Sequence, residues 1–201
     1  MKTRILTLVT VAAMVLGVGT KALAAGKDSA NNHEVSTVLN DVNKINKIEV
    51  RGNVEVYVTD NDADQVKVYN KYYEESALVQ SKNGTLRISS YADQKLVVWV
   101  KAADLREIVA YDNAEVRSFG KLSPIELKVT LNNNAYAKLD VDGVGMNVTV
   151  NDRAKADLMG TVNSCTLRYA QSATVNGTEF AAEHMTRIVD AHAATNEYAG
   201  L

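Results

Sequence analysis

The stretch Val129-Thr-Leu-Asn-Asn-Asn-Ala135-Tyr-Ala137 decides the predicted fold, because four other segments of the chain align with it. All five segments have Ala at the seventh position, and their starting residues are separated by 21, 19, 19 and 20 residues. The other four segments are 108–116, 148–156, 167–175 and 187–195. Self-similarity at a nearly fixed period indicates structural units that stack on one another.

Within each segment, apolar and polar residues alternate and then give way to a polar centre. Val129 and Leu131 flank Thr130, which is the period-two pattern of a half-buried strand. Asn and Asp dominate the polar centres, and these residues tolerate left-handed backbone and form turns. We therefore expect an all-β fold, a short right-handed parallel β-helix (solenoid) with rungs of about 20 residues and the Ala packed inward beside each turn. A helical solenoid is excluded, because residues 105–201 carry no stripe of apolar residues with the 3.6-residue period.

The first half of the chain also reads as strands. Asn83-Gly84 is a strong turn signal between two of them. Trp99 lies in an apolar run, Leu-Val-Val-Trp-Val, and is expected in the core. The predicted strands are 54–58, 65–69, 85–89 and 96–100.

The N-terminus has the three parts of a secretory signal. Lys2 and Arg4 precede an apolar run over residues 5–19, and small residues follow at the positions of an A-x-A cleavage site. The apolar run is shorter than the roughly 20 residues that span a bilayer. We predict a signal peptide over 1–24 that is cleaved after Ala24, a flexible leader over 25–43 and one domain over 44–201, in an exported protein of the periplasm, the cell surface or the extracellular space.

Removal of residues 1–24 leaves 19 basic and 24 acidic residues, a net charge of −5. This charge argues against binding to nucleic acid or to anionic membranes, both of which need a basic face. No second long apolar run follows the signal, so no membrane span is expected after cleavage. Cys165 is the only cysteine, which excludes an internal disulfide and indicates a small buried hydrophobe.

Two acidic residues are candidates for catalysis. Asp112 and Asp152 fall in the same column of the aligned segments, two rungs apart, which corresponds to roughly 9.6 Å at the spacing of β-strands. That separation is near the upper limit for the carboxylate pair of an inverting glycosidase. The alternative, which we favour, is that acids are simply common at turns.

Asp60, Asp62 and Asp64 are candidates for a metal site, because their spacing resembles the start of a calcium loop. An EF-hand needs Gly at the sixth position and Glu at the twelfth, where this chain has Gln65 and Lys71. A solvated turn between two strands is the favoured reading. His184, His192 and Cys165 are too few ligands for a zinc site. The sequence predicts no cofactor.

Aromatic residues are the best candidates for ligand binding, since tyrosine rings stack on sugars and anchor interfaces. Packing in the core or at an edge is the alternative and is the more common fate of aromatic residues. The candidates are Tyr69, Tyr72, Tyr73, Tyr111 and Tyr136.

The order of three motifs resembles a bacterial family described as the "putative auto-transporter adhesin, head GIN domain". The motifs are Ile45-Asn-Lys-Ile-Glu-Val-Arg-Gly-Asn-Val-Glu-Val-Tyr-Val58, Asn83-Gly-Thr-Leu-Arg-Ile88 and Leu105-Arg-Glu-Ile108, followed by the aligned segments. The resemblance covers about residues 44–201. It implies export, a β-helical fold and an adhesive role, and it supplies no catalytic residue. Relatives commonly carry Ser-Gly at the turns where this chain has, for example, Asn113-Ala114 and Asn134-Ala135.

These observations together predict a non-catalytic envelope or extracellular protein that presents a rigid β surface, in the manner of an adhesin, to a glycan or to an envelope or surface protein. The alternative is a polysaccharide-active enzyme that uses Asp112 and Asp152. Association of copies through an open end of the sheet is a further expectation, because open strand edges invite pairing.

Overall fold

The computed structural model describes residues 36–39, 42, 44–69 and 77–190 of the 201-residue chain. The predicted signal peptide, most of the predicted leader, Tyr72 and Tyr73 lie outside these ranges. Every regular element within them is a β-strand. The strands are β1 (Ser36–Leu39), β2 (Lys47–Gly52), β3 (Val54–Asp60), β4 (Gln65–Tyr69), β5 (Ala77–Lys82), β6 (Thr85–Ser90), β7 (Leu96–Ala102), β8 (Glu107–Tyr111), β9 (Glu115–Ser118), β10 (Glu126–Leu131), β11 (Tyr136–Val150), β12 (Lys155–Ala170) and β13 (Thr174–Asp190).

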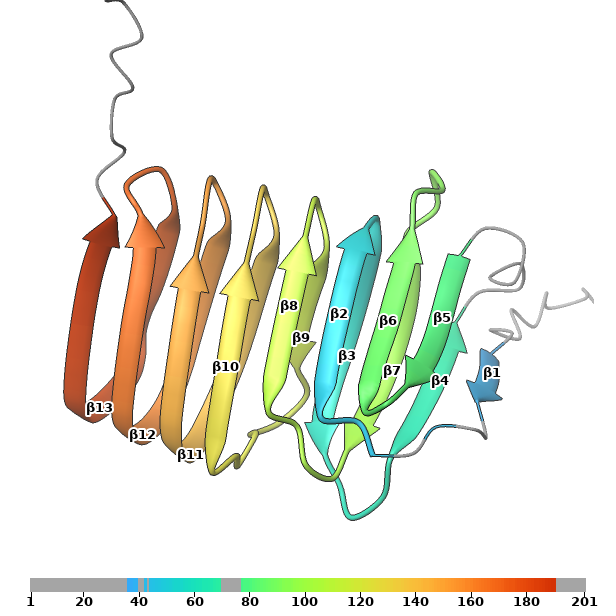
Figure 1. The fold of residues 1–201 in the computed structure, drawn as a ribbon, viewed down its shortest axis with the longest axis horizontal. Coiled ribbons are helices and arrows are strands. Elements are labelled where there is room, and N and C mark those ends of the chain that lie inside the picture. The colour runs from blue at the N-terminus through green and yellow to red at the C-terminus, as the bar shows by residue number, and fades with distance from the viewer. Residues whose placement is uncertain (1–35, 40–41, 43, 70–76, 191–201) are drawn as a thin grey trace, which may run out of the picture. The chain divides into compact units, whose positions relative to one another are not determined.

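All of these strands belong to one mixed sheet of 13 strands. One arm of the sheet has the order β1-β4-β7-β3-β9, and the other has the order β10-β8-β2-β6-β5. The long strand β11 joins the arms, because its first residues pair with β9 and its last residues pair with β10. β12 and β13 continue from β11, so the sheet curls into half a barrel with the two arms facing each other (Figure 1).

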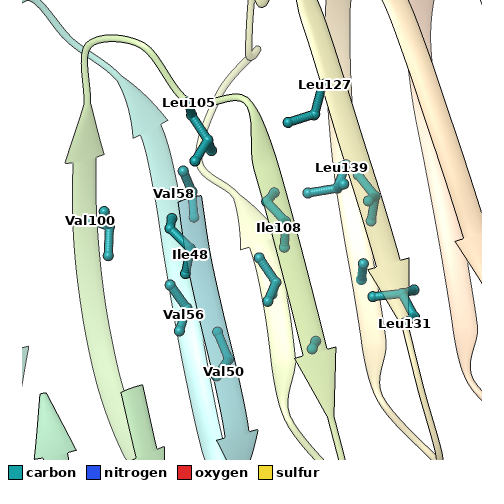
Figure 2. Packing of buried hydrophobic residues seen from close by; sticks show 14 of the residues in the cluster. Ile48, Val50, Val56, Val58, Val100, Leu105, Ile108, Leu127, Leu131 and Leu139 are labelled. Atoms are coloured by element: carbon teal, nitrogen blue, oxygen red, sulfur yellow. The ribbon is translucent and has the colours of Figure 1, made fainter. Parts of the chain in front are cut away.

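The core lies between the two arms. In β3 the burial alternates strictly, with Val54, Val56 and Val58 fully buried and the residues between them only partly buried. The same alternation holds in β2 and β7, so each strand turns one apolar row inward. Figure 2 shows these rows meeting, with side chains such as Ile48 and Val56 directed into the space between the strands. Each such side chain contributes roughly 1.5–3 kcal/mol on burial.

The predicted right-handed parallel β-helix is wrong. The pairs β1–β4, β4–β7 and β5–β6 are antiparallel, so the sheet is mixed. The strands also do not stack in sequence order: β2 lies between β6 and β8, and β3 lies between β7 and β9. After the edge strand β1, the chain thus enters the middle of the sheet at β2 and β3, adds β4 to β7 on one side of them and then returns to add β8 to β13 on the other side. Alternation of apolar residues predicts strands but encodes neither their direction nor the side on which the next strand pairs.

The pairing register predicted from the aligned segments is nevertheless correct. Val129 pairs with Ile108 on one side and Val148 on the other, Val148 pairs with Leu167, and Leu167 pairs with Arg187. The alanines of the seventh column that are fully buried are Ala114, Ala135 and Ala154.

The predicted turns are also present. The amide of Ala135 donates a hydrogen bond to the carbonyl of Asn132 at 3.1 Å, and Ala114 and Ala154 make the same contact across their own turns. Asn133 has a φ of 60°, in the left-handed region that Asn and Asp adopt more readily than other residues with a side chain. Asn83 and Gly84 have φ values of 51° and 77°, and they form the hairpin turn between β5 and β6.

Two smaller predictions concern Cys165 and the open edge of the sheet. Cys165 is buried, as expected, and burial raises the pKa of its thiol. β13, by contrast, pairs on one side only among the described residues, and Val189 is 52% exposed there. Association of copies through this edge stays a prediction.

Candidate binding surface

The outer face of the first arm carries a group of aromatic side chains. Because Val56 and Val58 point into the core, Tyr57 between them points outward, and the same alternation turns Trp99 of β7 outward. Tyr57 and Trp99 are paired residues on neighbouring parallel strands. Tyr69 at the end of β4 and Phe119 just after β9 complete the group. We call these four residues the aromatic face.

Trp99 is the centre of the aromatic face. Its ring lies 4.9 Å from the ring of Tyr57, with an angle of 22° between the planes, so the two rings stack. The ring of Phe119 lies 4.9 Å from Trp99 on a plane tilted by 60°, and that of Tyr69 lies 6.4 Å away. Phe119 is 58% exposed, whereas Tyr57, Tyr69 and Trp99 are half-buried, so the ring of Phe119 is the most open to a ligand.

Paired charges adjoin the aromatic rings. Arg117 of β9 faces Tyr57 across the strand pair and donates hydrogen bonds to Glu55 at 2.9 Å and to Glu115 at 2.7 Å. Glu115 also accepts a hydrogen bond from Lys95 at 2.6 Å. The Tyr57 hydroxyl donates to Glu55 at 3.0 Å. Each cation of this network therefore has a carboxylate partner.

These contacts shift the pKa values of the network in predictable directions. The hydrogen bond to Glu55, together with burial, raises the pKa of Tyr57. Burial alone would raise the pKa of Glu115, but the hydrogen bonds from Lys95 and Arg117 outweigh it and lower that pKa. The network is consequently fixed near neutral pH, with Glu115 ionised and Tyr57 protonated.

Tyr136 extends this surface beyond Arg117. The guanidinium of Arg117 lies 5.1 Å from the centre of the Tyr136 ring, within the range of a cation–π contact. The Tyr136 hydroxyl donates to Asp157 at 2.6 Å. Burial and this hydrogen bond raise the pKa of Tyr136 to about 12. Tyr136 and Arg117 line a shallow hollow together with Asn134, Arg153 and Lys155.

The tyrosines predicted from the sequence are thus divided. Tyr69 belongs to the aromatic face, and Tyr136 adjoins it through Arg117. Tyr111 ends β8 in the other arm, where the guanidinium of Arg51 lies 3.8 Å from the centre of its ring. Tyr72 and Tyr73 lie outside the described residues.

The sequence reading missed Tyr57, Trp99 and Phe119. The expectation that Trp99 lies in the core is wrong, because Val98 and Val100 hold the buried positions on either side of it. The signal was available in the alternation itself: once Val98 and Val100 are inward, Trp99 must be outward. Tyr57 stands in the same relation to Val56 and Val58.

The candidate catalytic acids hold neighbouring turns together. Asp112 and Asp152 both have positive φ, at 61° and 55°. Asp152 accepts a hydrogen bond from the amide of Asn133 at 2.8 Å, and Asp112 accepts one from the hydroxyl of Tyr91 at 3.0 Å. Both carboxylates therefore have partners that a turn residue is expected to have. Catalysis by this pair stays an untested alternative.

The acids of the candidate calcium loop have separate roles. Asp64 accepts hydrogen bonds from the amide of Ile45 at 2.8 Å and from that of Ala103 at 2.9 Å, and so connects the loop to two other segments. Asp60 accepts a hydrogen bond from the amide of Ser123. Asp60 and Asp62 line an open hollow. Within the described ranges, no group of three or more His, Cys, Asp or Glu side chains is placed to hold a metal ion.

Solved structures with this curled all-β fold are mostly described as adhesins. A "putative adhesin" from Bacteroides fragilis has a TM-score of 0.67 at 15% identity, covering 78% of this chain and 76% of its own. A "putative adhesin" from Parabacteroides distasonis has a TM-score of 0.60 at 14% identity, covering 78% of each chain. A "putative lipid binding protein" from the same species has a TM-score of 0.62 at 10% identity, covering 79% of each chain. At these identities the likeness concerns the fold alone.

A family model, and not the likeness of fold, places the chain in an adhesin-like class. The chain belongs to the family "putative auto-transporter adhesin, head GIN domain", whose model matches residues 44–199. No curated protein matches the sequence. Membership of an adhesin-like family suggests an exported or surface protein. None of the residues that the structure describes forms a helix long and apolar enough to cross a membrane.

Proposed function

We propose that the protein is a non-catalytic, adhesin-like binding protein that uses the aromatic face as its contact surface. The observation that carries the proposal is that Trp99 and Tyr57 point outward from strands whose alternate residues, on the opposite face, build the core. A contiguous group of apolar side chains on an outer face marks an interaction site, in contrast to single exposed apolar residues, and Tyr and Trp are enriched among the residues that dominate binding energies.

The sheet beneath the aromatic face supports such a role because it is rigid. β3 pairs with β7 over seven residues and with β9 over four, and Val56 and Val58 anchor it in the core. A surface that is ordered before binding loses little conformational entropy when a ligand arrives. Two classes of ligand suit an exported adhesin-like protein. One is a glycan, and the other is a protein of the envelope or the cell surface.

Binding of the purified chain to envelope fragments from its own organism tests the proposal. We expect Trp99→Ala to weaken binding by about tenfold or more, the effect expected when a central interface aromatic is truncated. Tyr91→Ala is the matched control, because Tyr91 is 72% exposed but is not part of the aromatic face. Equal binding by folded Trp99→Ala and the unaltered chain would refute the proposal.

We also propose that the protein is exported, because its family is adhesin-like and residues 1–24 have the three parts of a cleaved secretory signal. Fractionation of cells that express the full chain, followed by N-terminal sequencing of the exported protein, tests both parts of this statement. The expected mature N-terminus is Ala25. A chain that stays in the cytoplasm with Met1 intact would contradict it.

A further inference from the structure

We propose that the aromatic face binds a neutral polysaccharide. This inference rests on the proposed function, since it names the ligand chemistry of the same surface. Two properties of the surface carry it: a row of rings across the strands, and a central network of charges that already have partners within the protein.

The rings form a row that crosses the strands. Tyr69 on β4, Trp99 on β7 and Tyr57 on β3 follow one another across the first arm, and Arg117 and Tyr136 continue the row onto β9 and β11. Neighbouring strands are about 4.8 Å apart, so the row extends over roughly 20 Å. A site of that length fits a chain of several sugar units better than a single small molecule. Sugar rings present C–H groups that pack on aromatic rings, and Phe119 offers an exposed ring for such packing.

The charges at the centre of the row argue for a ligand without charge. Glu55 and Glu115 both bind Arg117, and Glu115 also binds Lys95. A polyanion would have to approach these two carboxylates, and a polycation would have to approach Arg117, so a charged polymer gains little at this centre. Lys67, which faces Trp99 from β4, lies over the ring of Tyr69 at 4.6 Å from its centre, and Arg153 and Lys155 lie at the other end of the row, in the hollow beside Tyr136. Hydroxyl groups, in contrast, can donate to the remaining lone pairs of the carboxylates and accept from the bound cations. Sugars combine an apolar face with many hydroxyls, which is the combination that this surface presents.

Trp99 supplies the readout for a direct test, because it is the only tryptophan of the chain. The purified chain is titrated with three neutral polysaccharides (dextran, a yeast mannan and a soluble β-glucan) and with two acidic ones (polygalacturonate and alginate), at low and at high salt. We expect a neutral polysaccharide to change the Trp99 emission, with an affinity that is independent of salt. A response only to acidic polysaccharides, or no response to any of the five, overturns the proposal.

Three variants connect the emission change to the aromatic face. Phe119→Ala should weaken the neutral interaction by about tenfold, as for other truncated contact aromatics. Glu55→Gln should weaken it less, because it keeps a carbonyl acceptor but disrupts the contact with Arg117. Tyr91→Ala should have no effect. If Tyr91→Ala weakens binding as much as Phe119→Ala, the aromatic face is not the site and the proposal fails.

Treatment of the envelope fragments separates this inference from the function on which it rests. Periodate oxidises the vicinal diols of sugars, whereas protease removes proteins. Binding that depends on Trp99 and is lost after periodate supports the polysaccharide. Binding that depends on Trp99 but is lost after protease and survives periodate overturns the polysaccharide and leaves the binding function standing.

Discussion

Trp99 and Tyr57 face each other across the parallel pair β7–β3, with ring centroids 4.9 Å apart. Offset stacking of this kind contributes about 0.5–1.5 kcal/mol beyond simple burial. Both rings are on the outer face, so their stacking stabilises a surface and not the core. The rings are therefore held in position before any ligand is bound.

A double-mutant cycle on Trp99→Ala and Tyr57→Ala measures this stacking. We expect a coupling of about 0.5–1.5 kcal/mol in the free energy of unfolding, obtained from urea titrations followed by circular dichroism. The cycle of Trp99→Ala with Tyr91→Ala should give no coupling, since the two residues are not in contact. A coupling near zero in the first cycle would mean that the rings do not stack in solution.

The pH dependence of stability should depend on Glu115. The contacts with Lys95 and Arg117 lower the pKa of Glu115 in the folded protein below its ordinary value of 4.5. The unfolded chain then binds more protons between the two values, so the stability that Glu115 provides is complete above about pH 5 and is lost as the pH falls through the folded pKa. Glu115→Gln should therefore be less stable than the unaltered chain at pH 7 and should lose less stability on acidification.

Melting temperatures between about pH 3 and pH 7 test this expectation. Glu183→Gln is the matched control, because Glu183 lies exposed on β13, and its curve should run parallel to that of the unaltered chain. Glu107 has a pKa lowered in the same way, by hydrogen bonds from Lys47 and Lys128 that outweigh its burial. Some acid sensitivity should therefore persist in Glu115→Gln. Identical curves for Glu115→Gln and the unaltered chain would contradict the assigned contacts.

Asp64 should matter for stability whether or not calcium is present. Its two oxygens accept hydrogen bonds from the amides of Ile45 and Ala103. Hydrogen bonds to a charged group contribute about 1.5–3 kcal/mol, so Asp64→Ala should cost about 2 kcal/mol of unfolding free energy. Asp62→Ala, at an exposed position of the same turn, should stay within about 0.5 kcal/mol. Urea titrations with calcium and with chelator give both values, and an effect of Asp64→Ala that appears only with calcium would show that the acid serves a metal.

Most strands, the register of the aligned segments and their turns could be predicted from the sequence because they depend on local patterns, whereas β1 and β5 were not predicted. Alternation of the type Val129-Thr130-Leu131 sets which side chains are buried, and the alignment of Val129 with Val148 sets which residues pair. The mixed topology could not be predicted, because nothing in β4 distinguishes an antiparallel from a parallel neighbour. Pairing of β4 with β7 joins two segments that are separated in the sequence by residues 70–95.

The binding surface was predictable only in part. The sequence indicates Tyr69 as a candidate for ligand binding because it lies close to Tyr72 and Tyr73. Tyr57 and Trp99, in contrast, are 42 positions apart and meet only through strand pairing. Hydrophobicity alone assigned Trp99 to the core. The alternation would have assigned it correctly, because a strand cannot bury both Trp99 and its neighbours Val98 and Val100 on one face.

Gly160, where β12 bends between the arms, should not tolerate a side chain. Its φ is +96°, and a Cβ there would lie 2.2 Å from the carbonyl oxygen of Val141, its partner on β11. Gly120 has a similar φ of +83°, but a Cβ there would meet no heavy atom within 4 Å. Both alanine variants incur backbone strain of about 1–3 kcal/mol, so the difference between them isolates the clash.

We expect Gly160→Ala to lose at least about 2 kcal/mol more than Gly120→Ala, because β11 and β12 must move apart to admit the methyl group. Urea unfolding followed by circular dichroism measures both variants; Trp99 emission is not used, because Gly120 adjoins Phe119, whose ring contacts Trp99. Hydrogen exchange should also quicken at the amides of β11 and β12 in Gly160→Ala and stay unchanged in Gly120→Ala. Equal losses in the two variants would mean that the strand pair can accommodate the methyl group, and that the bend of β12 does not need glycine for its close approach to Val141.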